Sequence, residues 1–459
     1  MATQMTYPDH SRAVLRLGLP LAGGHLAQIA IGVTDTVMLG WYGVDALAAV
    51  TLGSTFFFTL MIFGSGFAWA VMPLVASFVA EGDETGVRRA TRMGLWLSIG
   101  FALLALPLMI WSEPVLLFTG QEPGVAADAG AYLQIAGLGI FPALLVMVLK
   151  SYLAALERTQ IVLWITVLSA VANGLANYAL IFGNWGAPEM GIAGAAVASV
   201  VSHLVSLAGV VIYVRVVLPE HALFQRLWKV DPQMLARVFR LGWPIGLTSL
   251  SETGLFAASA LMMGWLGKVP LAAHGIAVQL SAVTFMLHVG LSNVATIRAG
   301  NALGRRDPAH MQRGAVTVTV LSLITAALTI VLFIALPEPL LSLFMQRDEP
   351  QRDAILQIGT LLLITAAFFQ LVDGAQVIAL GLLRGVQDTQ VPMILAAVSY
   401  WLLGIPCSYI FGFWFGWGGV GVWLGLVAGL GMAALLLSLR FWGSALPGFR
   451  AETAGAQSA

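Results

Sequence analysis

The sequence predicts an all-α integral membrane protein with twelve transmembrane helices in two pseudo-symmetric six-helix bundles. Three observations lead to this fold class. Of the 459 residues, 59% are hydrophobic and only 10% are charged, whereas a soluble domain carries about 25% charged residues. The apolar residues gather in twelve long stretches, and the two halves of the chain repeat each other. Because a chain inside a bilayer must satisfy its own backbone hydrogen bonds, these stretches are expected to be helices.

Each stretch is long enough to span a bilayer, which takes about 20 apolar residues. In chain order the stretches cover residues 15–40, 46–80, 91–112, 128–156, 160–183, 190–217, 237–266, 270–302, 314–336, 353–383, 391–415 and 419–443. They use up most of the chain, which leaves no room for a nucleotide-binding domain or a large extramembrane enzyme. The single cysteine, Cys407, excludes disulfides within the chain.

One long polar segment interrupts the apolar pattern between the sixth and seventh stretches. It predicts an N-terminal six-helix lobe at residues 1–217, a cytoplasmic linker at 218–240 and a C-terminal six-helix lobe at 241–459. If both termini are cytoplasmic and the loops alternate, 19 of the 22 Lys and Arg residues fall on the cytoplasmic side. The positive-inside rule therefore favours this orientation.

The two halves match at an offset of 224 residues. Leu17-Gly18-Leu19-Pro20 aligns with Leu241-Gly242-Trp243-Pro244, Gly40 with Gly264, and Asp83 with Asp307. Later in each half the offset becomes 230. An even number of helices per half gives repeats of parallel topology, the arrangement of transporters whose two halves rock about a central site.

Three acidic residues, Asp35, Glu252 and Asp373, lie inside apolar stretches. A charge at the bilayer centre costs about 3 kcal/mol on insertion scales, so such a residue must face the bundle interior, find a partner or be protonated. Asn173 and Asn177 are spaced four apart, which places their amides on one face of the fifth helix. These five residues are the candidates for proton or cation coupling. Structural carboxyl groups and polar contacts between helices are the alternatives.

Five further residues are candidates for lining a substrate site. Gln28 aligns with Glu252 across the repeat, and His25 shares the first helix with Asp35. Phe285, Phe369 and Gln376 lie on helices expected near the C-terminal acids, where aromatic faces can stabilise a cation. Ordinary apolar packing is the alternative for the aromatic residues.

Several other motifs limit the function. Gly421, Gly425 and Gly429 form a small-xxx-small run, which is typical of close helix packing. The one Gly-Lys pair, Gly267-Lys268, lacks the remaining positions of a phosphate-binding loop. We therefore expect no ATP, no nucleic-acid partner, no catalytic residues and no cofactor other than a coupling ion.

The chain resembles the multidrug and toxic compound extrusion (MATE) family, in its bacterial NorM-type branch. The resemblance rests on Leu17-Gly18-Leu19-Pro20, on Thr34-Asp35-Thr36-Val37-Met38-Leu39-Gly40 and on Asn173-Gly174-Leu175-Ala176-Asn177. In the second half it rests on Glu252, on Val372-Asp373-Gly374-Ala375-Gln376 and on Gly381-Leu382-Leu383-Arg384-Gly385. One departure is present: Phe368-Phe369-Gln370 precedes Asp373 where related proteins often carry a tyrosine.

The resemblance implies a monomeric antiporter in the bacterial inner membrane that exports cationic or amphiphilic drugs in exchange for H⁺ or Na⁺. It implies an N-lobe cation site at Asp35, Asn173 and Asn177 and a C-lobe one at Glu252 and Asp373. These two sets are the candidate Na⁺ sites, and the sequence leaves the coupling ion open.

Two other functions remain as alternatives. A lipid-linked precursor flippase is expected to line its cavity with several basic residues, whereas only Lys150 and Arg298 lie near membrane depth here. An intramembrane enzyme requires two converging catalytic groups, but Asp35 and Asp373 lie in opposite halves of the chain.

Overall fold

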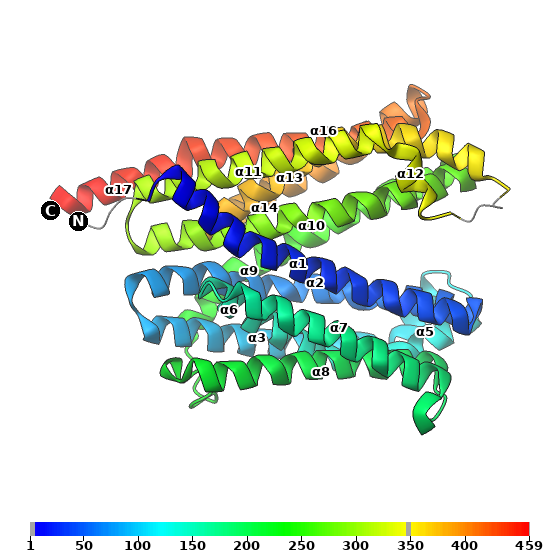
Figure 1. The fold of residues 1–459 in the computed structure, drawn as a ribbon, viewed down its shortest axis with the longest axis horizontal. Helices are drawn as coiled ribbons and strands as arrows, with labels where there is room; N and C mark the ends of the chain where they lie inside the picture. The colour runs from blue at the N-terminus through cyan, green and yellow to red at the C-terminus, as the bar shows by residue number, and fades with distance from the viewer. Residues whose placement is uncertain (1–4, 346–349, 459) are drawn as a thin grey trace. The chain divides into compact units, whose positions relative to one another are not determined.

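The computed structural model describes residues 5–345 and 350–458, and most of these residues are helical, with no strand among them. In chain order the helices are α1 (Tyr7–Tyr42), α2 (Val44–Glu81), α3 (Glu84–Ile110), α4 (Ser112–Phe118), α5 (Pro123–Ala136), α6 (Ile140–Ala155), α7 (Thr159–Phe182), α8 (Gly191–Val217), α9 (Pro232–Leu266), α10 (Lys268–Gly304), α11 (Pro308–Ala335), α12 (Pro337–Ser342), α13 (Arg352–Gly385), α14 (Gln390–Val398), α15 (Ile405–Tyr409), α16 (Gly418–Arg440) and α17 (Leu446–Ser458) (Figure 1). Three π-helical segments, Ser399–Gly404, Ile410–Trp414 and Phe441–Ala445, continue the helices near the C-terminal end.

Within the described residues, twelve helices are long and apolar enough to cross a membrane. Each matches one of the twelve predicted stretches, and no stretch runs more than two residues past the end of its helix, so the predicted fold class is confirmed. The largest differences are at the two ends, where the first helix begins at Tyr7 and the last continues to Gly455. Helices extend beyond the apolar stretches because polar residues continue them outside the hydrocarbon core.

The internal repeat is visible in the helix caps. Asp83 caps α3 by accepting a hydrogen bond of 2.9 Å from the backbone nitrogen of Gly86. Asp307, its counterpart at the offset of 224, caps α11 in the same way through the backbone nitrogen of His310, also at 2.9 Å. Since a capping carboxylate satisfies one of the free amide groups at a helix start, the matched pair begins equivalent helices in both halves.

The contacts between residues divide the chain into two compact units. One comprises residues 23–246, and the other comprises residues 1–22 together with 247–459. The long helices α1 and α9 therefore each contribute to both units. The lobe boundaries predicted at residues 217 and 241 stay a prediction.

In the unit of residues 1–22 and 247–459, α10 and α13 pack at very close range. A Cβ atom on Gly381 would lie 2.5 Å from the backbone oxygen of Ser292, and one on Gly385 would lie 2.8 Å from that of Thr296. The hydroxyl groups of Ser292 and Thr296 donate hydrogen bonds of 2.7 and 2.9 Å to the carbonyls of Val377 and Gly381. Small residues thus let the backbones approach, and hydroxyl groups join them.

The three glycines of α16 behave as the sequence predicts. A Cβ atom on Gly421, Gly425 or Gly429 would lie within 2.7 Å of the chain segment packed against it. At Gly425 the obstructing atom is the backbone nitrogen of Ser408, only 2.1 Å away. The glycine run is therefore a packing surface of this unit.

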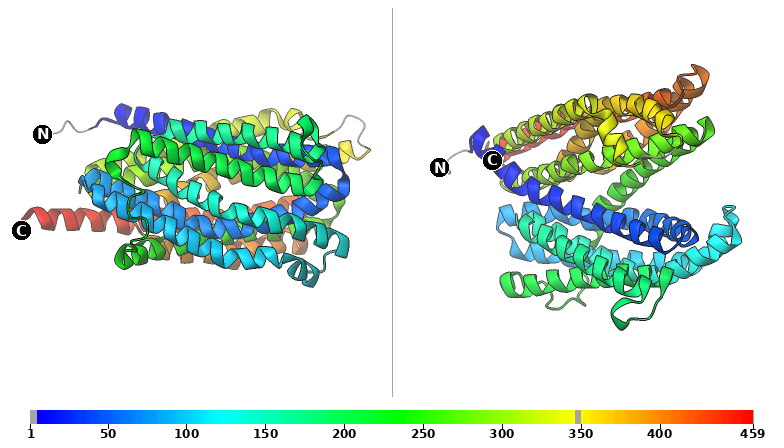
Figure 2. Two further views of the ribbon diagram at one scale, coloured as in Figure 1. Left: turned by 90° about the horizontal axis from the view of Figure 1, so that it is seen from below. Right: turned by 45° about the vertical axis from the view of Figure 1, so that its right-hand side comes forward.

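Both described chain ends lie at one end of the unit, where α17 projects outward (Figure 2).

In the unit of residues 23–246, side chains of α3 hold the polar segment that follows α8. Arg88 and Arg92 donate hydrogen bonds to the backbone carbonyls of residues 221–223. Arg89 forms an ion pair with Asp231, which also caps the first turn of α9. The hydrogen bond from Arg89 lowers the pKa of Asp231, since it favours the ionised carboxylate.

Candidate functional site

Asp35 of α1 lies beside Asn173 and Asn177 of α7, as the sequence predicts. Nδ2 of Asn177 donates a hydrogen bond to Oδ1 of Asp35 and another, of 3.2 Å, to Oδ1 of Asn173. Both asparagine side chains are fully buried, and Asp35 is partly buried. The structure therefore brings the three predicted residues into one polar cluster, called here the N-terminal cluster.

The local sequence explains why this cluster lacks a fixed positive charge on its own helix. Between Leu17 and Leu39, α1 contains no Asp, Glu, Lys or Arg except Asp35. The two asparagines offer dipoles but no charge. An ionised Asp35 therefore keeps its negative charge, whereas a proton or a bound cation would neutralise it.

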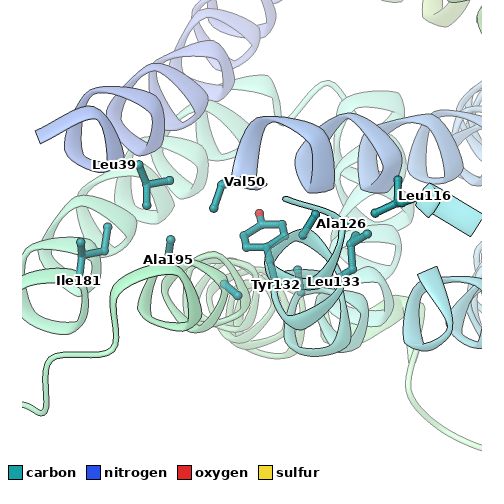
Figure 3. Close-up of a cluster of buried hydrophobic side chains, with 11 residues drawn as sticks. Leu39, Val50, Leu116, Ala126, Tyr132, Leu133, Ile181 and Ala195 are labelled. Carbon is teal, nitrogen blue, oxygen red and sulfur yellow. The ribbon is translucent and has the colours of Figure 1, made fainter. Parts of the chain in front are cut away.

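An apolar core closes the N-terminal cluster on one side. Leu39 and Ile181 lie one helical turn beyond Asp35 and Asn177, on the same helix faces. They belong to a cluster of buried side chains that also contains Tyr132 (Figure 3). The hydroxyl of Tyr132 accepts a hydrogen bond of 3.3 Å from the hydroxyl of Ser54 and lies within electrostatic range of Asp35. Tyr132 is thus a site neighbour that the sequence reasoning missed.

The hydrogen bonds of the N-terminal cluster indicate how a cation would fit there. Carboxylate and amide oxygens are suitable ligands for a hard cation. Asn177, however, turns its nitrogen toward Asp35, while Oδ1 of Asn177 and Nδ2 of Asn173 have no hydrogen-bond partner among the described residues. This arrangement satisfies an ionised carboxylate directly. A bound Na⁺ would require the Asn177 amide to turn its oxygen toward the ion.

A second polar cluster, called here the C-terminal cluster, centres on Gln376 of α13. Nε2 of Gln376 donates a hydrogen bond of 2.9 Å to Oε1 of Glu252 on α9. Oε1 of Gln376 accepts a hydrogen bond from the hydroxyl of Tyr400. Gln376 and Tyr400 are fully buried. The glutamine thus links an acid and a phenol from two different helices.

Asp373 and Arg384 complete the C-terminal cluster. Asp373 lies one turn before Gln376 and is only 3% exposed. It interacts with Gln376 and is repelled by Glu252, while Arg384 attracts Glu252. Oδ1 of Asp373 has no hydrogen-bond partner in the described part of the chain. One guanidinium balances one of the two carboxylates, so a proton or a monovalent cation would neutralise the other.

Tyr400 is the main residue of this cluster that the sequence reasoning missed. The tenth stretch lacks a tyrosine near Asp373, and the sequence does not show that a tyrosine of the next stretch lies there instead. Tyr400 lies in the π-helical segment Ser399–Gly404, and such bulges change which side chains face a partner helix. The only available signal was a tyrosine within an otherwise apolar stretch.

The remaining predicted site residues lie elsewhere in the two units. His25 is partly buried and close enough to Lys150 for their charges to interact, and Gln28 is exposed. Phe285 is partly buried, whereas Phe369 is 1% exposed and packs edge-on against two other aromatic rings. In this structure Phe369 contributes to packing, and a substrate-binding role for these four residues stays a prediction.

A family model described as MatE matches residues 20–179 and again residues 244–410. The chain belongs to the MATE family. The two matches begin 224 residues apart, the same offset that aligns the halves in the sequence, so the duplication is part of the family pattern.

Individual relatives agree with this assignment. The chain is 45% identical to a probable multidrug resistance protein NorM of Rhizobium meliloti, over 95% of this chain and 94% of the relative. It is 44% identical to a protein of the same description from Agrobacterium fabrum, over 94% of each chain. A crystal structure of MATE in the bent conformation superimposes with a TM-score of 0.86 at 18% identity, covering 98% of this chain and all of the other. This MATE protein is thus a multi-pass membrane transporter and not an enzyme.

Proposed function

We propose that this MATE protein is a secondary antiporter that exports cationic or amphiphilic compounds in exchange for inward H⁺ or Na⁺ by alternating access. It works as a monomer in the bacterial inner membrane with both termini in the cytoplasm, and it uses no ATP. The observation that carries the proposal is the hydrogen-bonded cluster of Asp35, Asn173 and Asn177. It holds an acid inside a membrane-spanning helix with no basic residue on that helix nearby.

Protonation changes what this cluster can do. An ionised Asp35 only accepts hydrogen bonds, as it does from Asn177, whereas a protonated Asp35 also donates one. The unpaired Oδ1 of Asn177 is a suitable acceptor once its amide turns. A cationic compound favours the ionised form, so compound and proton oppose each other's binding. Such a reciprocal coupling free energy is what an antiporter requires.

The C-terminal cluster supplies a second group of the same kind. Glu252 and Asp373 share Gln376 and one nearby guanidinium, and the uncompensated carboxylate is a candidate partner for H⁺ or Na⁺. Tyr400 adds a phenol hydroxyl, which α13 does not supply because it has no tyrosine. We infer that this hydroxyl fixes the side-chain orientation of Gln376 and thereby the hydrogen bond to Glu252.

The test is compound efflux from proteoliposomes of the purified protein. A Na⁺ gradient is imposed without a pH gradient, and then a pH gradient without Na⁺. Efflux of a cationic dye under at least one gradient supports the antiporter and identifies its ion. No efflux under either gradient, in vesicles shown to be sealed, would contradict the proposal.

One observation keeps a flippase of lipid-linked precursors as the second candidate. In the unit of residues 23–246, Nζ of Lys150 donates a hydrogen bond of 2.8 Å to Thr166, and its charge acts on both His25 and His203. A cation inside this unit suits an anionic cargo. Movement of a pyrophosphate-linked lipid between leaflets, with no dye efflux, would favour this function.

A further inference from the structure

A narrow recess lies in the unit of residues 1–22 and 247–459, at the N-terminal end of α11. It shares no residue with the N-terminal or C-terminal cluster. Its lining residues come from the start of the chain and from the first turns of α11. They are Met5, His10, Asp307, Ala309, His310 and Arg313.

The start of α1 places His10 in this recess. Thr6 and Asp9 form a reciprocal cap: Oδ2 of Asp9 accepts hydrogen bonds from the backbone nitrogen and the hydroxyl of Thr6, at 3.0 and 2.6 Å. The backbone nitrogen of Asp9 in turn donates to the Thr6 hydroxyl at 3.5 Å. Such a cap fixes the first helical turn. His10, the next residue, is fully buried.

The hydrogen bonds of Arg298 determine which nitrogen of His10 carries the proton. Nη2 of Arg298 donates to Nδ1 of His10 at 2.9 Å and to Nε2 of His310 at 3.0 Å. Because a guanidinium only donates, Nδ1 of His10 must be the acceptor, and a neutral His10 carries its proton on Nε2. That Nε2 is buried without a hydrogen-bond partner among the described residues.

His10 is itself one of the residues that line the recess. The Nδ1 edge of the ring faces Arg298, which is not a lining residue. The opposite edge, with Nε2, is therefore the edge that borders the recess. A buried donor without an acceptor is destabilising, so an acceptor atom in the recess would be favoured.

The surrounding charges favour an anionic acceptor. Arg313 lines the recess and donates a hydrogen bond of 3.0 Å to the carbonyl of Met5. Arg298 stands behind His10. The two carboxylates close by, Asp9 and Asp307, already accept backbone N–H groups at the starts of α1 and α11. The N-terminus of α11, a helix of 28 residues, adds the positive end of its dipole.

We propose that this recess binds a phosphate group, with Nε2–H of His10 and the guanidinium of Arg313 as its donors. The recess has room for a group of about the size of a water molecule, so it admits one phosphate oxygen, and the remaining oxygens face Arg313. In the orientation predicted from the sequence, the recess faces the cytoplasmic leaflet. The phosphate then comes either from an anionic lipid headgroup or from the free anion.

The experiment measures thermal unfolding of the full-length purified protein. In one arm, inorganic phosphate is titrated in detergent against chloride at equal ionic strength. In the other, the protein is placed in nanodiscs of phosphatidylglycerol or of phosphatidylcholine. The variants are His10→Phe, which keeps a ring and removes the N–H, and Arg313→Gln. Arg306→Gln is the matched control, because it removes an exposed positive charge from the loop next to α11.

We expect stabilisation that grows with phosphate or appears in phosphatidylglycerol, and binding weakened roughly tenfold or more in His10→Phe and Arg313→Gln. The arm that responds identifies the source of the phosphate. Arg306→Gln should respond like the wild type. Equal stabilisation by chloride, a full response in both His10→Phe and Arg313→Gln, or no response in either arm would overturn the proposal.

Discussion

Gln376 donates a hydrogen bond of 2.9 Å to Glu252, and the same side chain accepts one from Tyr400. A glutamine amide has one oxygen and one nitrogen, so a donor on the Tyr400 side selects the amide orientation that presents N–H to Glu252. The phenol therefore acts on the acid through the amide between them. This relationship makes Tyr400 a positioning residue of the C-terminal cluster.

The first prediction concerns that phenol. Tyr400→Phe leaves Oε1 of Gln376 buried without its donor, which costs about 1–3 kcal/mol of unfolding free energy. It also frees the amide to turn, so ion-driven efflux should fall. Thermal unfolding and proteoliposome efflux measure the two effects. Tyr409→Phe, which removes an exposed hydroxyl from the same span, is the control and should change neither.

The second prediction concerns Glu252 and Asp373 as a pair. Because they repel each other and share Gln376, their protonation is coupled, and apparent pKa values belong to the pair. Glu252→Gln and Asp373→Asn should each abolish ion-coupled efflux while the protein still folds. The double variant should lose little more efflux than either single variant, because the effects of two residues that act together are not additive. Wild-type-like efflux in both single variants would show that the pair is structural.

The helices could be predicted from the sequence because apolar stretches of sufficient length leave one option in a bilayer. Asp35, Asn173 and Asn177 could be grouped because helical spacing places the asparagines on one face. Tyr400 could not be assigned to the C-terminal cluster from the sequence, because its position depends on a π-helical segment that shifts the helix register. The sequence shows that the segment at 218–240 is polar. It does not show that this segment is attached to α3, because the attachment depends on arginine side chains that reach backbone carbonyls.

The third prediction uses the ion pair of Arg89 and Asp231. The pKa of Asp231 is lower in the folded protein, so the stabilisation is complete above the unfolded pKa, near 4, and is lost as the pH falls through the folded pKa. Asp231→Asn keeps a helix-capping residue and removes the charge. Because Arg89 is 43% exposed, solvent screening limits the loss to about 0.2–1 kcal/mol at pH 7. We measure the thermal unfolding of the wild type and of Asp231→Asn from pH 7 to pH 3. The difference in stability between the two proteins should disappear in acid.

The fourth prediction concerns orientation. In a Cys407→Ala background, a cysteine at Gln225 lies on the predicted cytoplasmic side and one at Gln121 on the other. Both positions are exposed. An impermeant thiol reagent applied to intact cells should label Gln121→Cys and should reach Gln225→Cys only after permeabilisation. Labelling of Gln225→Cys from outside would reverse the predicted topology.

The last prediction concerns Asp35. Its carboxylate accepts a hydrogen bond from Asn177, and an asparagine side chain at this position can still accept one through its oxygen. Asp35→Asn should therefore keep the fold, but it has no charge for a cationic compound and no proton to exchange. We expect weaker binding of a cationic dye and loss of the pH dependence of that binding. Asp128→Asn, at an exposed acid on α5, is the matched control. If Asp35→Asn protein pumps normally under a pH gradient, Asp35 is structural, and coupling must reside in the C-terminal cluster alone.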